Sequence, residues 1–211
     1  MEYIEIMKKI IVVGYKGKMG SLIFSALKNQ FIVFGVDREN CIENFDADMV
    51  VDFASHESSV NSARFCLKKN IPLIIGSTGQ TEEENREITK ISKHIKILKR
   101  ANFARGIDVL KGFVENVLLL NPVKFEIIEK HHKNKKDAPS GTAKEIENFI
   151  KERFGGIVEI SSIREGEEMG EHTIIAYCGD EKLKVTHNVY SRNVFVLGVV
   201  SEINNLLKQS N

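Results

Sequence analysis

The segment from residue 129 to residue 142, EKHHKNKKDAPSGT, holds the side chains best suited to chemistry. Its adjacent histidines, His131 and His132, are followed by three lysines within four residues, in a chain whose formal net charge is only +1. Such a local cationic site in a nearly neutral protein indicates an anionic substrate. We expect one histidine to face that substrate, and the other to bind it from the strand end or to orient the loop.

Two features of this segment could bind carboxylates. Ser140, Gly141 and Thr142 are expected to open a helix, whose free N–H groups and hydroxyls make an anion pocket. Lys135 would be the second anchor, and Asp137 partly balances the positive charge. The sequence therefore predicts a carboxylate-binding pocket at this helix start.

Two other interpretations of the histidines are a zinc site and an exposed polar loop. Zinc would draw on His172, His187 and Cys178, which lie in predicted strands nearby. Adjacent histidines on a strand point to opposite faces and cannot easily share one ion. We therefore predict no metal.

A glycine-rich turn follows the apolar run Ile10–Val13 and precedes a helical pattern. The turn departs from G-x-G-x-x-G at Tyr15, while Gly17 and Gly20 hold the second and third glycine positions. Gly17 would let the backbone approach a pyrophosphate, and Gly20 would let helix and strand pack closely. The other reading of the motif is a tight connection without a ligand.

An acidic residue ends the next predicted strand. Asp37 lies twenty residues after Gly17, where its carboxylate can accept hydrogen bonds from an adenosine ribose. The guanidinium of Arg38 could bind a 2′-phosphate, so the pair predicts tolerance of both NADH and NADPH. A solvated turn with an incidental ion pair is the alternative for Arg38.

The elements that position these residues follow two patterns. Up to about residue 100, short β-branched runs alternate with helical patterns and show no period-two alternation, which indicates a parallel sheet covered on both faces. The strands expected after residue 102 favour antiparallel pairing, with a hairpin at Gly179-Asp180. We predict an α/β protein: a Rossmann-type domain of residues 1–103, completed by a C-terminal helix within 192–211, and an α+β domain of residues 104–191 with a mixed, mostly antiparallel sheet.

Composition excludes several classes of protein. The charge balance gives no global field for nucleic acid or anionic membranes, and the apolar runs are too short to span a bilayer. Three widely spaced cysteines suit neither a disulfide framework nor a zinc knuckle, so a reducing, cytoplasmic location is expected. The first residues do not form a signal peptide, and residues 1–6 are interpreted as an extension before Met7.

The segment E-x-H-H-x-x-K-x-D-A-P-S-G-T resembles the signature of dihydrodipicolinate reductases. The resemblance extends over nearly the whole chain, through 14–20, 51–53, 75–79, 101–103, 164–166, 170–173 and 191–192. It implies NAD(P)H-dependent reduction of 4-hydroxy-tetrahydrodipicolinate, a cyclic dicarboxylate that loses water before it accepts hydride, in the diaminopimelate route to lysine. It also implies a homotetramer assembled through the sheets of the second domain.

On this resemblance, His131 is the expected general acid and Lys135 assists it while binding a carboxylate. Substrate binding is assigned to His132, Lys135, Ser140, Gly141 and Thr142. The expected cofactor contacts are Gly14, Lys16, Gly17, Lys18, Met19, Gly20, Asp37, Arg38, Phe53, Gly76, Ser77, Thr78, Ala101, Asn102 and Phe103.

The chain also departs from the family pattern. Lys18 and Ser77 replace the usual arginine and threonine, and the 39–51 connection is short, which bears on nucleotide affinity. Two rivals remain: an aspartate or homoserine type of dehydrogenase, and a non-catalytic NAD(P)-binding sensor. The first would share the nucleotide domain but not the His131 to Thr142 segment, and the second would not need His131 and Lys135 together.

Overall fold

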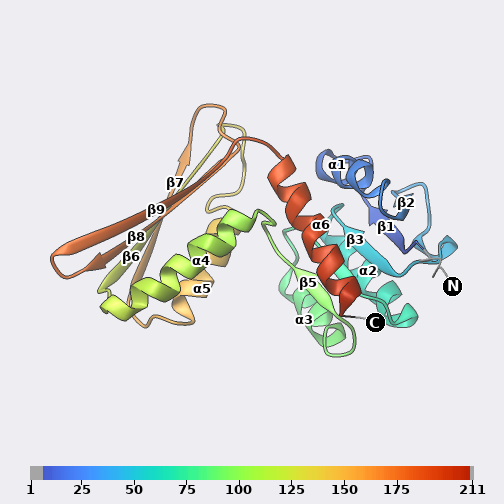
Figure 1. Cartoon of the computed structure of the whole chain (residues 1–211), viewed down its shortest axis with the longest axis horizontal. Helices are drawn as coiled ribbons and strands as arrows, with labels where there is room; N and C mark the ends of the chain where they lie inside the picture. Colours follow the sequence, from blue (N-terminus) through green and yellow to red (C-terminus); the bar gives the residue numbers. More distant parts are fainter. Residues whose placement is uncertain (1–6, 210–211) are drawn as a thin grey trace, which may run out of the picture. The chain divides into compact units, whose positions relative to one another are not determined.

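The structure is a computed structural model that describes residues 7–209, so the extension inferred for residues 1–6 lies outside the described residues. The chain forms two compact units (Figure 1). Unit 1 comprises the chain up to Ala101 and again from Val196, and unit 2 is Asn102–Phe195. None of the described helices is long and apolar enough to cross a membrane.

Unit 1 is built on a parallel sheet of five strands in the order β2-β1-β3-β4-β5. The strands are β1 (Lys9–Val13), β2 (Ile32–Val36), β3 (Met49–Asp52), β4 (Leu73–Ile75) and β5 (Ile97–Lys99). The intervening helices are α1 (Lys18–Leu27), the short η1 (Ile42–Asn44), α2 (His56–Lys69) and α3 (Glu82–Ile91). The strand order reverses at β1, which is where a doubly wound sheet opens its binding crevice.

Side chains on both faces of this sheet are buried. Ile11 and Val13 of β1 belong to a core cluster with Ala63 of α2 and Ile88 of α3. Ile10, the neighbour of Ile11 on the strand, is also fully buried, and α1 contacts β1 and β2. This two-sided burial explains the missing alternation, and it confirms the predicted Rossmann-type sheet.

Unit 2 is a sheet of four strands in the order β7-β6-β8-β9. The strands are β6 (Lys124–His131), β7 (Ile157–Arg164), β8 (Gly170–Cys178) and β9 (Glu181–Val189). The helices are α4 (Arg105–Val117), η2 (Leu118–Leu120), α5 (Gly141–Lys151) and the first turn of α6 (Asn193–Lys208). The predicted mixed sheet is confirmed, and Gly179, with a φ of 62°, makes the expected hairpin between β8 and β9.

One pairing differs from the sequence-based expectation. The first two strands of unit 2, β6 and β7, are parallel and not antiparallel. Helix α5 lies between the two strands in the chain. It returns the chain to the end of the sheet at which β6 begins, as parallel neighbours require. The antiparallel neighbours of this sheet are β6 with β8 and β8 with β9.

Strand β6 alternates strictly between buried and partly buried side chains. Its inward positions are Phe125, Ile127, Glu129 and His131, of which the first two pack in a core cluster with residues of α4 and α5. The same face thus changes from apolar to ionisable in its last two inward positions. A buried carboxylate and a buried imidazole must find partners there, since desolvated polar groups without hydrogen bonds are costly.

Candidate functional site in the second unit

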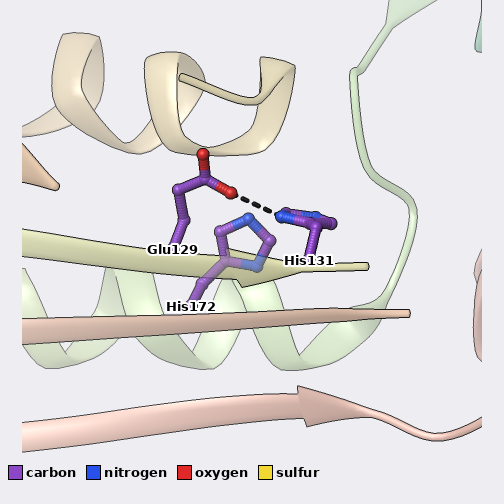
Figure 2. A group of neighbouring side chains, drawn as sticks. All are labelled: Glu129, His131 and His172. Carbon is purple, nitrogen blue, oxygen red and sulfur yellow. Dashed lines mark hydrogen bonds and ion pairs between the residues drawn. The ribbon is translucent and has the colours of Figure 1, made fainter. Parts of the chain in front are cut away.

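Glu129 and His131 are partners on the inward face of β6. They are two residues apart on a strand, so their side chains point to the same side of the sheet. Glu129 is fully buried, His131 is almost so, and the His131 Nδ1 atom shares a hydrogen bond with a Glu129 carboxylate oxygen. Figure 2 shows this contact, with His172 beside it. The arrangement leaves Nε2 as the nitrogen of His131 that can face a ligand.

Three further groups approach the Glu129 carboxylate. Arg164 donates from Nη2 to Oε1 at 2.5 Å, and the Ser140 backbone N–H donates to the same oxygen at 3.2 Å. Burial raises the pKa of the Glu129 carboxyl, but hydrogen bonds from Arg164 and Ser162 and the charge of His131 outweigh burial and hold the pKa at about 2. Glu129 is therefore ionised throughout the neutral range.

His131 experiences opposing influences. Burial lowers its pKa, the neighbouring Glu129 carboxylate raises it, and the positive charges of Lys135 and Arg164 lower it again, so that the pKa falls below its usual value. Gly170 matters sterically, because a Cβ there would lie 3.0 Å from His131 Nε2. Glycine thus leaves space beside the nitrogen that would transfer a proton.

His172 is a buried residue that packs against His131. Its ring meets the His131 ring edge-on, with the centroids 5.2 Å apart. Burial lowers the pKa of His172 to about 3, so this imidazole is neutral at physiological pH. Its Nε2 lies 3.3 Å from Ser140 Oγ, which links it to the start of α5.

The first turn of α5 forms as the sequence predicts. Ser140 caps the helix, because its hydroxyl accepts a hydrogen bond from the Ala143 N–H. Thr142 Oγ1 accepts from Asn102 Nδ2 at 3.1 Å, and Asn102 is itself held by the Ala104 N–H. This turn lies against Glu129 and His172, because Ser140 contacts the first through its backbone N–H and the second through its hydroxyl.

Lys135 and His132 lie on the partly exposed side. The Lys135 ammonium is 2.7 Å from an Asp137 carboxylate oxygen, and Asp137 also accepts from the Gly141 backbone N–H. A carboxylate of the chain itself therefore occupies two of the groups predicted to bind substrate. His132 is half-buried, and its backbone N–H donates to Glu168.

Glu129, His131 and His172 also each offer one atom that could ligate a metal, and these atoms lie within 4.8 Å of one another. The Glu129 carboxylate already accepts hydrogen bonds from Arg164, Ser140 and His131, and a guanidinium at 2.5 Å would repel a cation. Within residues 7–209, no ligand group joins His172 to His187 and Cys178. These side chains suit proton transfer better than metal binding.

The predicted nucleotide turn lies in unit 1. Gly14 has a φ of 81°, and its carbonyl accepts from the Gly17 N–H at 2.9 Å, which makes a tight turn. A Cβ on Gly20 would lie 2.1 Å from that carbonyl oxygen, so only glycine lets α1 start this close to the strand. Lys18 and Met19 are the first two residues of α1, whose N-cap is Gly17.

Tyr15 explains the departure from the three-glycine pattern. Its ring lies over Gly35 of β2, where a Cβ would be 2.6 Å from the ring, and it packs against Phe24 of α1 with centroids 5.3 Å apart. The side chain at position 15 therefore points into the packing between β2 and α1. Gly35 has no side chain, and it thereby leaves the space that the Tyr15 ring fills.

A pocket of about 350 Å³ adjoins this turn, lined by Gly14, Lys16, Gly17, Asp37, Arg38 and Phe53 among others. Lys16 is 2.6 Å from Asp37 and 3.0 Å from Glu39, and its hydrogen bond lowers the pKa of Asp37. The close-packed turn, the helix N-terminus and an acidic residue at the end of β2 fit a dinucleotide.

The remaining predicted cofactor residues lie at the ends of later strands. Gly76 packs under the Phe53 ring, and Ser77 is buried with its hydroxyl 2.6 Å from that of Ser59. Thr78 follows in the same loop. Ala101 falls in unit 1, whereas Asn102 and Phe103 belong to unit 2.

Four side chains near these sites were not predicted to act there: Glu129, Arg164, His172 and Asp52. The fully buried Asp52 accepts hydrogen bonds from Ala54, Ser58 and Ser62, and so holds the turn that carries Phe53. The period-two spacing could have assigned Glu129 to the face of His131. No local signal places Arg164 and His172 beside them, because that depends on the pairing of β7 and β8 with β6.

Comparisons with known proteins cover almost the whole chain. A family model described as "Dihydrodipicolinate reductase, N-terminus" matches residues 8–103, and one described as "Dihydrodipicolinate reductase, C-terminus" matches residues 106–211. A 4-hydroxy-tetrahydrodipicolinate reductase of Thermosipho africanus is 34% identical over 192 residues, which cover 90% of this chain and 87% of that protein.

Two solved structures show the same fold. A dipicolinate-bound dihydrodipicolinate reductase from a Paenisporosarcina species has a TM-score of 0.76 and 23% identity, with 96% of each chain covered. An aspartate dehydrogenase from Thermotoga maritima has a TM-score of 0.64 and 14% identity, with 95% of this chain and 97% of that chain covered. At these identities the likeness concerns the fold alone, so the fold does not choose between the two activities.

Proposed function

The chain belongs to the dihydrodipicolinate reductase family, and we propose that it reduces 4-hydroxy-tetrahydrodipicolinate, through dihydrodipicolinate, with NADH or NADPH. The product would be tetrahydrodipicolinate, on the diaminopimelate route to lysine. The observation that carries the assignment is the buried Glu129–His131 pair against the first turn of α5. It joins a proton donor to an anion-binding turn, which reduction of a cyclic dicarboxylate needs.

His131 acts as the general acid. Its Nδ1 is held by Glu129, so Nε2 is the atom from which the proton leaves, and Gly170 leaves room beside it. Bound NADH or NADPH supplies the hydride. Lys135 lies close enough to affect His131 electrostatically, and it assists the proton transfer while binding a carboxylate.

The carboxylates of the substrate bind at the first turn of α5 and along the loop before it. Gly141 and Thr142 offer backbone N–H groups at the helix N-terminus, and Ser140 and Thr142 offer hydroxyls. His132 and Lys135 add positive or hydrogen-bonding groups. A substrate carboxylate would take the place of Asp137 between Lys135 and the Gly141 N–H. Fixing the ring in this way aligns it for reaction.

The cofactor binds in unit 1. Gly14, Lys16 and Gly17 lie in the turn, and Lys18, Met19 and Gly20 form the start of α1. Asp37 and Arg38 take the adenosine ribose with or without its 2′-phosphate. The nicotinamide end is assigned to Phe53, Gly76, Ser77, Thr78 and Ala101 of unit 1 and to the next two residues of the chain, Asn102 and Phe103, with which unit 2 begins.

The assembly is a homotetramer that forms through the sheets of unit 2. Supporting this, Ile157 and Ile163 of β7 are exposed in the single chain, with exposed fractions of 60% and 38%. Light scattering coupled to size-exclusion chromatography should give four times the 23.8 kDa chain mass. A mass equal to that of one chain would refute the tetramer. A cytoplasmic location fits the three free cysteines, because the cytosol keeps thiols reduced.

A coupled assay tests the activity. Substrate is generated in the cuvette from pyruvate and aspartate semialdehyde by the preceding synthase, and the oxidation of NADH and of NADPH is followed by absorbance. Oxidation that requires the synthase supports the proposal and ranks the two cofactors. If either cofactor binds but is not oxidised when the synthase is active, the substrate assignment is wrong.

A further inference from the structure

The Glu129 carboxylate lies at the centre of the site in unit 2, yet none of the roles above requires it to touch the substrate. It is fully buried, and its two oxygens bind His131, the Ser140 N–H and Arg164, with a further hydrogen bond from Ser162 of β7. One oxygen meets His131 Nδ1. The other accepts from the Ser140 N–H and from Arg164 of β7, whose Nη2 also donates to the Asp137 carbonyl at 2.7 Å.

We propose that Glu129 is a positioning residue that fixes the imidazolium of His131 and the first turn of α5 relative to each other. The inference rests on the proposed function, because it assumes that His131 donates the proton. A single rigid carboxylate on β6 sets both the direction of Nε2 and the place of Ser140. The distance between the proton donor and the carboxylate pocket is therefore fixed before the substrate binds.

Electrostatics give Glu129 a second effect on the same histidine. The charged or titratable groups that act on His131 are Glu129 on its own strand, Lys135 from the following loop, Arg164 from β7 and His172 from β8. His172 is neutral, and the other two neighbours are cations. Among these four, Glu129 alone carries a negative charge, so it is the group that favours the protonated donor against burial.

Replacing Glu129 with glutamine changes the charge and keeps the shape. Arg164 and the Ser140 N–H both donate to one side of the carboxylate, so the amide oxygen of glutamine must face them. Its NH2 group then faces His131 Nδ1, which can accept that hydrogen bond only when it carries no proton. The Glu129→Gln variant should therefore disfavour imidazolium, and the protonated fraction falls about tenfold for each pKa unit lost.

Arg164 provides a variant with the opposite sign. Its guanidinium competes with His131 for the Glu129 carboxylate and lowers the pKa of His131. Arg164→Gln can keep a hydrogen bond to Glu129 while removing the positive charge. The protonated form of His131 should then persist to higher pH, whereas general damage to the fold would not move two variants in opposite directions.

The experiment is the pH profile of kcat for the whole enzyme in the synthase-coupled assay. In Glu129→Gln we expect kcat at pH 7.5 to fall about tenfold or more, the alkaline limb to move to lower pH, and NADH binding to stay unchanged. In Arg164→Gln the limb should move to higher pH. Glu147→Gln is the matched control, because it removes the same charge from α5, where Glu147 pairs with Lys151.

The double variant Glu129→Gln/His131→Gln identifies the path of the effect. If Glu129 acts through His131, the double variant is no slower than His131→Gln alone. The inference would be overturned if the alkaline limb of the pH profile stayed in place in both Glu129→Gln and Arg164→Gln. It would also be overturned if the fold-decrease in kcat of the double variant equalled the product of the two single fold-decreases. If Glu129→Gln does not fold, the direction in which the alkaline limb moves in Arg164→Gln tests the inference: a move to higher pH supports it, and a limb that stays in place or moves to lower pH overturns it. A His131→Gln variant with full kcat would instead refute the proposed acid itself.

Discussion

Replacing Gly20 with alanine tests how closely the nucleotide turn must pack against α1. A Cβ at this position would lie 2.1 Å from the Gly14 carbonyl oxygen and 2.7 Å from its carbon. Nonbonded heavy atoms prefer about 3.5 Å, so the turn would have to move by roughly 1 Å. Both atoms belong to the backbone, and no change of rotamer relieves the contact. We expect the dissociation constant of NADH to rise about 10- to 100-fold, as misplacement on this scale can cause.

Gly112→Ala in α4 is the matched control. A Cβ there meets nothing within 4 Å, and glycine inside a helix costs about 0.5–1 kcal/mol relative to alanine. This variant should bind NADH normally and unfold at a higher temperature. The chain has no tryptophan, so binding is best measured by calorimetry or by the fluorescence of NADH itself. Wild-type NADH affinity in Gly20→Ala would refute the reasoning.

Three other perturbations address the reaction and its specificity. His131→Gln should lower kcat about 10²–10⁴-fold with NADH affinity unchanged. Wild-type kcat should fall as pH rises, because burial lowers the pKa of His131 and only the protonated form of His131 donates. A kcat independent of pH would contradict the role of His131 as the proton donor. Arg38→Gln should raise the KM for NADPH more than that for NADH, and equal effects would defeat the assignment. Asp137→Asn should lower the KM for the dicarboxylate several-fold, since its carboxylate no longer competes for Lys135; a raised KM would count against that displacement.

The sequence predicted most of the fold because its elements carry local signals. Ile10–Val13 is a continuous apolar run, and it is buried on both faces as a central parallel strand should be. Ser140 before a helical pattern and Gly179-Asp180 between strands also behave as their local chemistry requires. The parallel pairing of β6 with β7 could not be read in this way, since partner choice between strands depends on how α5 returns the chain.

For the site, local sequence patterns identify the chemical groups: two histidines, lysines and a helix start in one segment, and a glycine turn followed by Asp37. Which of these groups meet depends on the three-dimensional arrangement of the strands. Strand periodicity gives only the face of Glu129 and His131, whereas the register of β7 and β8 brings Arg164 and His172 to them. Likewise, Tyr15 replaces a glycine because Gly35, on the neighbouring strand, leaves space for its ring. Local patterns fix elements and directions, but contacts between strands arise only when the sheet forms and desolvated groups must find partners.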